Sequence, residues 1–373
     1  MSEATTTTFT VRDARPDELA GLRDVASRAF DRFDMLLYST RGREVLVAVD
    51  ADEQPLGGVV LHATPRADRP APHGRLGVVH FIFVDPDIHV SGIGTALRQA
   101  ADQRFDALGC TETSARIDAT NSASQALHRA GGYQLADAGD QLRRWGWRLP
   151  LRWLQAGHGL DPGMQLWLRP ATRPDRPHHT GRALAGTWLL NLLLLTVVAW
   201  RAPRGEAGAL VTVVSLAGAL AVLLGAREAA IRLVARRAGT RLQHAAWPNG
   251  IGLAGALAAA VGVWFPLTGS STPQQPGWRH DRHVPLLGKA HLAGGLVVAT
   301  LAWATILIDP PATAPVWVEI RRAALMLALV DLVVPYSPMI GNAARHVRRW
   351  STPAWLLLAL AAATAQTWIL VTG

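Results

Sequence analysis

Two glycines with the spacing of an anion-binding turn lie between an apolar stretch and a segment of helical periodicity. Gly92 and Gly94 belong to the sequence HVSGIGT at 89–95, which follows the apolar residues 77–84. Glycine permits a tight turn, and the amides at a helix N-terminus point toward a bound anion. A lone Gly-x-Gly is also typical of a purely structural turn. Its position before a helix favours a phosphate-binding turn.

A histidine on the next predicted helix is a candidate proton donor. His128 lies within the helical stretch 122–130, which ends at two glycines. An imidazolium can donate a proton, and its unperturbed pKa of about 6.5 suits that task. The alternative is a solvent-facing histidine. No general base is evident, because His80 is typical of a core histidine and Asp85 of a turn cap.

The first half of the chain alternates between strand and helix patterns. Apolar residues three and four apart predict helices, and alternating or continuous apolar runs predict strands. Strands are predicted at 8–13, 44–49, 57–63, 77–84, 112–118 and 165–168, with helices at 16–30, 94–108 and 122–130. The second and third strands form a predicted hairpin. The pattern predicts a mixed α/β domain in which the glycine turn joins a strand to a helix.

Two motifs of this domain resemble those of a known family. Residues 83–94 (FVDPDIHVSGIG) resemble the acetyl-CoA signature of the GNAT acetyltransferase superfamily, with His89 where the family usually has Arg or Gln. Residues 121–133 (NSASQALHRAGGY) resemble its second cofactor motif. The likeness extends over about residues 8–169. It implies a GNAT-like mixed sheet with flanking helices in a domain of residues 1–169.

This resemblance also implies a cosubstrate and roles for individual residues. Acetyl-CoA is the expected cosubstrate, without a metal. The residues expected to bind it are Phe83, Val84, His89, Ser91, Gly92, Ile93, Gly94, Thr95 and Asn121. His128 stands where the family commonly has a tyrosine that protonates the leaving thiolate of CoA. It is therefore the expected catalytic residue.

The second half of the chain carries apolar segments long enough to cross a bilayer, which needs about 20 residues per helix. They lie at 183–200, 207–235, 250–267, 287–308, 316–336 and 353–371, after a Pro/Arg linker at 170–182. These segments predict an α-helical multi-span membrane domain over 183–373. The net charge is +9, and the arginines cluster beside apolar segments. That placement favours a lipid bilayer as the partner, and no nucleic acid is expected.

Charge placement also predicts topology. If about five helices cross and 250–267 is re-entrant, the basic clusters all fall on the side of the first domain. The positive-inside rule then predicts a multi-pass protein of the cell membrane with a cytoplasmic acyltransferase domain. Trp145, Trp147 and Trp153 belong to an Arg/Trp/Leu cluster that suits the water–bilayer interface. The alternative for them is packing in the core of the first domain.

Short motifs in the membrane half resemble site-2-type intramembrane metalloproteases. Residues 227–231 (REAAI) stand where that family has its His-Glu-x-x-His zinc motif, and 331–341 (DLVVPYSPMIG) resemble its Asn-x-x-Pro-x-x-Pro-Leu-Asp-Gly motif. Arg227, Ile231 and Ile340 replace the three metal ligands. The resemblance therefore implies a metal-free pseudoprotease in which these three residues converge. Glu228 would then pair with a nearby arginine.

Two functions remain open from the sequence. The first is a membrane-anchored, acyl-CoA-dependent N-acyltransferase that acetylates an unidentified amine. The alternative is a regulatory or binding membrane protein whose acyltransferase fold senses acyl-CoA without turning it over. Binding and turnover of acetyl-CoA distinguish the two.

Overall fold

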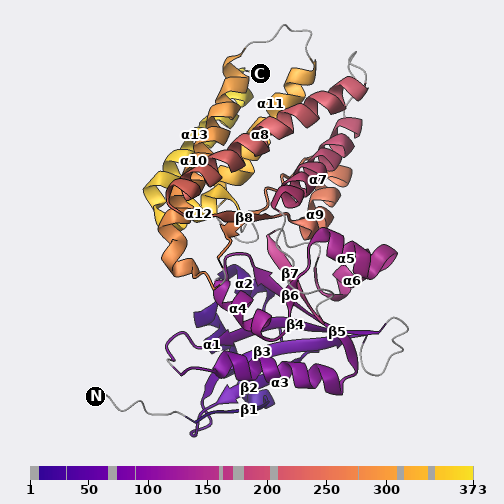
Figure 1. The fold of residues 1–373 in the computed structure, drawn as a ribbon, viewed down its shortest axis with the longest axis vertical. Coiled ribbons are helices and arrows are strands. Elements are labelled where there is room, and N and C mark those ends of the chain that lie inside the picture. Colours follow the sequence, from indigo (N-terminus) through magenta and orange to yellow (C-terminus); the bar gives the residue numbers. More distant parts are fainter. Residues whose placement is uncertain are drawn as a thin grey trace. The chain divides into compact units, whose positions relative to one another are not determined.

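The structure is a computed structural model that describes residues 8–30, 32–65, 74–88, 90–158, 163–170, 180–201, 209–275, 277–308, 315–334 and 341–372. The chain forms two compact units, whose elements are labelled in Figure 1. The first unit comprises 1–117, 123–158 and 166–175, and the second comprises 118–122, 159–165 and 176–373.

A seven-stranded mixed sheet is the frame of the first unit (Figure 1). Neighbouring strands follow the order β1-β2-β3-β4-β5-β7-β6. Their bounds are β1 Thr10–Asp13, β2 Glu44–Val49, β3 Pro55–Thr64, β4 Arg75–Val84, β5 Cys110–Asp118, β6 Gln134–Leu135 and β7 Met164–Arg169. The first four strands are antiparallel neighbours, whereas β4 and β5 are parallel. The predicted mixed sheet and its hairpin are confirmed.

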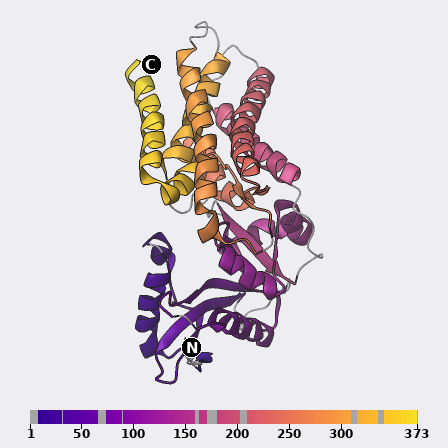
Figure 2. The same cartoon turned by 60° about the vertical axis from the view of Figure 1, so that its left-hand side comes forward.

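Helices cover both faces of this sheet (Figure 2). They are α1 Leu19–Ala29, α2 Arg32–Leu37, α3 Ile93–Ala107, α4 Ser122–Ala130, α5 Ala138–Trp145 and α6 Leu149–Gln155. Leu22 of α1 packs in one apolar core with Phe83 of β4, and Leu97 of α3 packs in another with Val79. The sequence did not predict α2, α5, α6 or β6, because elements this short show no clear period.

The tryptophan-rich stretch of α5 and α6 packs largely within the first unit. Trp145 is buried, and its Nε1 donates to Glu112 at 3.0 Å. Trp153 is half-buried in the same cluster, and its Nε1 donates to Gln141 at 2.8 Å. The predicted interfacial position is therefore wrong for Trp145, because a buried indole with a hydrogen-bond partner belongs to a core. Trp147 is 82% exposed, so the prediction stays open for that residue.

The second unit is a bundle of long helices that run alongside one another in both views (Figures 1 and 2). The principal ones are α7 Thr180–Arg201, α8 Ala209–Arg237, α10 His280–Leu307, α11 Pro315–Ala328 and α13 Thr352–Thr372. Within the described residues, four helices are long and apolar enough to cross a membrane: Thr180–Trp200, Leu210–Arg237, His280–Leu307 and Thr352–Val371. Helix α11 continues as a π-helical turn at Leu329–Val333. Because α7 begins at Thr180, the last residues of the predicted linker are helical.

Two short strands, paired as a small hairpin, flank the short apolar segment that begins near residue 250. Strand β8 (Leu242–Ala245) pairs antiparallel with β9 (Ser270–Pro273), and Ala245 lies opposite Ser270. Between them lie α9 (Ile251–Ala256) and a π-helical turn at Leu257–Val261. Residues 251–261 rise about 16 Å, roughly half the hydrocarbon thickness of a bilayer. The segment thus leaves one end of the hairpin and returns to it.

Charged side chains are paired inside the second unit. Arg227 of α8 donates to both carboxylate oxygens of Asp331, at 2.7 and 2.8 Å. Glu228 accepts from Arg232 at 2.7 Å, which confirms the predicted pairing with an arginine, and from Ser271 at 2.9 Å. Ile340 lies outside the described residues, so its convergence with Arg227 and Ile231 stays a prediction. Among the described residues, no group of three or more His, Cys, Asp or Glu is arranged to hold a metal ion.

Candidate active site

The parallel strands β4 and β5 part in the middle of the sheet. Their ladder ends where Val79 lies opposite Ala115, although β4 continues to Val84 and β5 to Asp118. A bulge against β3 accompanies this point, because Val60 pairs with Phe81 while Leu61 pairs with Val79. The bulge leaves His80 as the extra residue of β4. Beyond it, β4 backbone groups that face β5 are free of the ladder and can bind an extended ligand.

The glycine turn presents free amides at the start of α3. Gly92 has a φ of +93° and caps the helix, a conformation that favours glycine. The first backbone bond of the helix runs from Ala96 N to Gly92 O at 2.9 Å. The amides of Ile93, Gly94 and Thr95 precede it and point out of the helix. This arrangement fits the pyrophosphate of a nucleotide cosubstrate.

The predicted cosubstrate residues differ in what they can offer a ligand. Ser91, Thr95 and Asn121 are exposed, and Val84 and Gly94 are half-buried. The side chains of Phe83 and Ile93 are buried in the two cores, so only their backbone groups can take part. His89 lies outside the described residues. These assignments to cosubstrate binding stay predictions.

Comparison with known proteins identifies the family. Residues 11–133 match the model of the Acetyltransferase (GNAT) family. The L-methionine sulfoximine/L-methionine sulfone acetyltransferase of Pseudomonas aeruginosa is 34% identical over 132 residues, which are 34% of this chain and 72% of that protein. The chain belongs to the GNAT family. This membership confirms the predicted N-acetyltransferase class for the N-terminal domain.

Two further proteins are similar to part of this chain. The aminoglycoside N(6')-acetyltransferase type 1 of Klebsiella aerogenes is 34% identical over 93 residues, or 25% of this chain, and the match spans only 60% of that protein. A solved GNAT-family acetyltransferase from Staphylococcus aureus Mu50 is 14% identical to this chain, with a TM-score of 0.33. The match covers 43% of this chain and 98% of the Staphylococcus chain.

His128 of the GNAT domain is a buried histidine of α4. Only 1% of it is exposed, so the solvent-facing alternative is wrong. Its Nδ1 lies 2.8 Å from Ser124 O, so Nδ1 carries the hydrogen and Nε2 the lone pair. Nε2 is buried and has no hydrogen-bond partner among the described residues. Burial lowers the pKa of His128 to about 4, against the Ser124 carbonyl that raises it, so the ring is neutral at pH 7.

A pair of histidines, which sequence reasoning did not connect, lies where the two strands part. His80 Nε2 is 2.6 Å from His62 Nδ1, and the rings stack with centroids 4.6 Å apart. One of the two nitrogens must donate, so the pair shares a single hydrogen between them when neutral. Both residues lie in predicted strands, but only the register of β3 on β4 brings them together.

Two arginines surround this histidine pair with positive charge. Burial, the charge of Arg43, the His62 ring and the charge of Arg116 lower the pKa of His80 to about 2. Arg116 follows Ala115, the last residue of β5 that pairs with β4, and donates to Gly157 O at 2.8 Å. Asp85, at the end of β4, accepts from Asp87 N at 3.1 Å, which confirms it as the turn cap, and also pairs with Arg28. Positive charge therefore dominates at the point where β4 and β5 part.

Proposed function

We propose that this chain is a membrane-anchored N-acetyltransferase that moves an acetyl group from acetyl-CoA to a small amine. The observation that carries the proposal is the parting of β4 and β5 directly before the free amides of α3, in a chain of the GNAT family. The amides of Ile93, Gly94 and Thr95 would hold the pyrophosphate, and the freed edge of β4 would hold the pantetheine arm. Acetyl-CoA supplies the acetyl group.

The charge of the site favours an amine that also bears a carboxylate. Arg43 and Arg116 both act on His80 at the parting of the strands. A polycationic aminoglycoside would be repelled there, whereas an amino acid analogue can pair its carboxylate with a guanidinium. Of the two kinds of acceptor named for the relatives, the amino acid type fits this charge better.

Histidines would carry the protons of the reaction. The acceptor ammonium must lose a proton before its nitrogen attacks, and the neutral His62–His80 pair can take it up. Burial is the largest cause of the lowered pKa of His80, and a bound carboxylate would offset the further opposition to protonation from the charges of Arg43 and Arg116. His128 Nε2 would take a second proton, which the nitrogen loses as the amide bond forms, and give it to the departing sulfur.

An acceptor series tests the proposal. The full chain in detergent is given acetyl-CoA with methionine sulfone, its methyl ester or an aminoglycoside, and thiol release and acetylated product are measured. We expect kcat/KM for the free acid to exceed that for the ester by about tenfold or more, the size of a charged hydrogen bond. Arg43→Gln should remove this preference, and His62→Phe should lower kcat with little change in CoA affinity.

Arg41→Gln is the matched control, because Arg41 is an exposed arginine of the same loop. Equal rates for acid and ester would contradict the carboxylate assignment. CoA binding without acetylation of any amine tested would contradict the transferase itself.

His128 should be needed for turnover rather than for binding. Phenylalanine fills a similar volume without a proton-carrying atom, so His128→Phe should lower kcat by about 100-fold or more, the usual size of general acid–base catalysis. His128→Tyr restores the residue that the family commonly has there and should recover most of the rate. Steady-state kinetics and calorimetric CoA affinity measure both effects. A Phe variant as active as the unchanged chain would reduce His128 to a packing residue.

We also propose that the GNAT domain, residues 1–169, is cytoplasmic and that residues 183–373 form a multi-pass domain of the cell membrane. Four long apolar helices support membrane insertion. The pairing of Ala245 with Ser270 supports a re-entrant segment at 250–267, because both ends of that segment meet at one hairpin. This arrangement keeps the arginines near 232–241, 279–289 and 345–349 on the cytoplasmic side.

The membrane domain would resemble a site-2-type protease that has lost its metal. Arg227 stands at a ligand position of the resemblance, and its Nη2 lies 3.4 Å from the carbonyl oxygen of Gly341, the neighbour of Ile340. A Cβ at Gly294 would lie 2.7 Å from Ile231, so α10 passes close to α8 at the other ligand position. These contacts support a common point for the three substituted positions. A guanidinium at that point would exclude a cation.

A further inference from the structure

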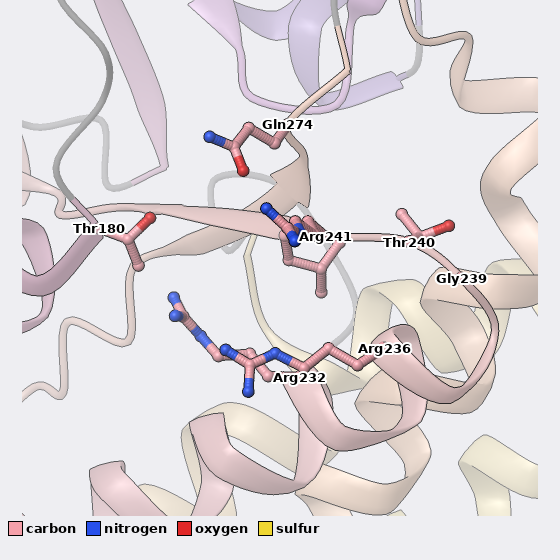
Figure 3. Close-up of a pocket in the computed structure, with 8 residues that line it drawn as sticks. Thr180, Arg232, Arg236, Gly239, Thr240, Arg241 and Gln274 are labelled. Atoms are coloured by element: carbon pink, nitrogen blue, oxygen red, sulfur yellow. The ribbon is translucent and has the colours of Figure 1, made fainter.

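A basic pocket lies where α8 ends and α7 begins, within the second unit. Its volume is about 510 Å³, and the polar side chains that line it come from Thr180, Arg232, Arg236, Thr240, Arg241 and Gln274. In Figure 3, the side chains of Arg232 and Arg236 extend from α8 toward the side of the pocket where Thr180 lies. Arg241 lies at the strand, and Gln274 lies on the other side of that strand from Arg232 and Arg236. A pocket of this size accommodates a phosphorylated head group.

The pocket concentrates positive charge, and none of its lining residues within the described part of the chain is acidic. Arg232 uses its Nε for Glu228, at 2.7 Å, while its Nη2 is buried and has no hydrogen-bond partner among the described residues. Arg236 and Arg241 are exposed. Glu228, the carboxylate paired with Arg232, also accepts from Ser271 at 2.9 and 3.0 Å. Three guanidinium groups against one shared carboxylate leave an excess of positive charge.

The C-terminus of α8 also lies at this pocket, and free carbonyl oxygens at a helix C-terminus would repel an anion. In α8, part of this negative charge is already taken up by hydrogen bonds. Thr240 N donates to Ala235 O and Gly239 N to Arg236 O, both at 2.9 Å, with Gly239 at a φ of +75°. This is the Schellman arrangement, in which the carbonyls of Ala235 and Arg236 in the last turn are already bonded. The pocket therefore presents guanidinium and hydroxyl groups.

If α7 and α8 cross the bilayer as proposed above, the pocket lies near the level of the lipid phosphates. Thr180 begins one helix able to cross a membrane, and Arg236 lies in the last turn of the next. These ends meet because α7 and α8 pack together and β8 packs on α7. We propose that this pocket binds a phosphate group, and that its position makes the head group of an anionic phospholipid the natural source. Guanidinium groups match phosphate oxygens in geometry and charge.

Native mass spectrometry of the full chain in mild detergent tests this site. Phosphatidylglycerol and phosphatidylcholine with the same acyl chains are titrated, with and without inorganic phosphate as a competitor. We expect phosphatidylglycerol to bind better, and Arg236→Gln with Arg241→Gln to weaken it by about tenfold or more. The matched control is Arg182→Gln with Arg237→Gln, which removes two exposed arginines at the same helix ends but outside the lining.

Each outcome bears on the proposal. Weaker phosphatidylglycerol binding in the pocket variant, with unchanged binding in the control variant, supports the proposed phosphate site. Displacement by millimolar inorganic phosphate would uphold the phosphate chemistry but point to a soluble source. Equal binding of the two lipids, or equal loss in both variants, would overturn it. If the pocket variant fails to fold, Arg241→Gln alone repeats the test, because Arg241 accepts from Gln274 N through its backbone oxygen, which this substitution keeps.

Discussion

Replacing Gly94 by glutamate should weaken CoA binding by about 100-fold or more, equivalent to about 2.7 kcal/mol. The Gly94 amide precedes the first hydrogen bond of α3 and is free to bind an anion. A glutamate there would place a carboxylate where the pyrophosphate belongs, and the two like charges would repel. Calorimetric titration of the full chain with CoA measures the loss.

The same substitution should leave the fold intact, which separates binding from stability. A Cβ at Gly94 would lie 3.7 Å from Leu127 and 3.8 Å from Val84, which are ordinary contacts. A negative charge in the first turn also stabilises a helix. Gly94→Ala is therefore the control and should retain most of the affinity. If the glutamate variant binds CoA as well as the unchanged chain, the cosubstrate lies elsewhere.

Breaking the Arg227–Asp331 ion pair should destabilise the membrane domain by about 3–5 kcal/mol. Both side chains are buried, with 3% of Arg227 and 0% of Asp331 exposed. Asp331 also accepts from Ala343 N at 2.9 Å, so the pair joins α8 to the π-helical turn and to the start of α12 (Ala343–Trp350). Either Arg227→Leu or Asp331→Leu leaves one buried charge without its partner. The midpoint temperature of thermal unfolding in detergent should then fall by roughly 10 °C.

The double variant Arg227→Leu/Asp331→Leu distinguishes a charge effect from a packing effect. With both charges removed, the loss should be smaller than in either single variant. Arg322→Gln is the surface control, because Arg322 is 57% exposed in its pair with Glu319 and such pairs contribute about 0–1 kcal/mol. Additive losses in the double variant would show that the two residues are not coupled.

Prediction from the sequence succeeded where the signal is local. The strand at 77–84, the glycine turn and the helix at 94–108 appear as β4, the capped turn and α3. The apolar lengths near 183–200 and 353–371 likewise appear as α7 and α13. Periodicity and glycine placement act over a few residues, so a single sequence is enough to read them. Strands β8 and β9 and helix α12 were missed, because short polar segments carry no such pattern.

The sequence by itself determined the GNAT resemblance, the α/β class of the first domain and the presence of a helical apolar domain. Only the tertiary structure decided which polar side chains meet. His62 reaches His80 through the register of two strands, and Arg227 reaches Asp331 across 104 residues. The basic pocket likewise needs the start of α7, the end of α8 and the hairpin together. Such contacts depend on how distant elements pack, and local residue patterns contain no record of that packing.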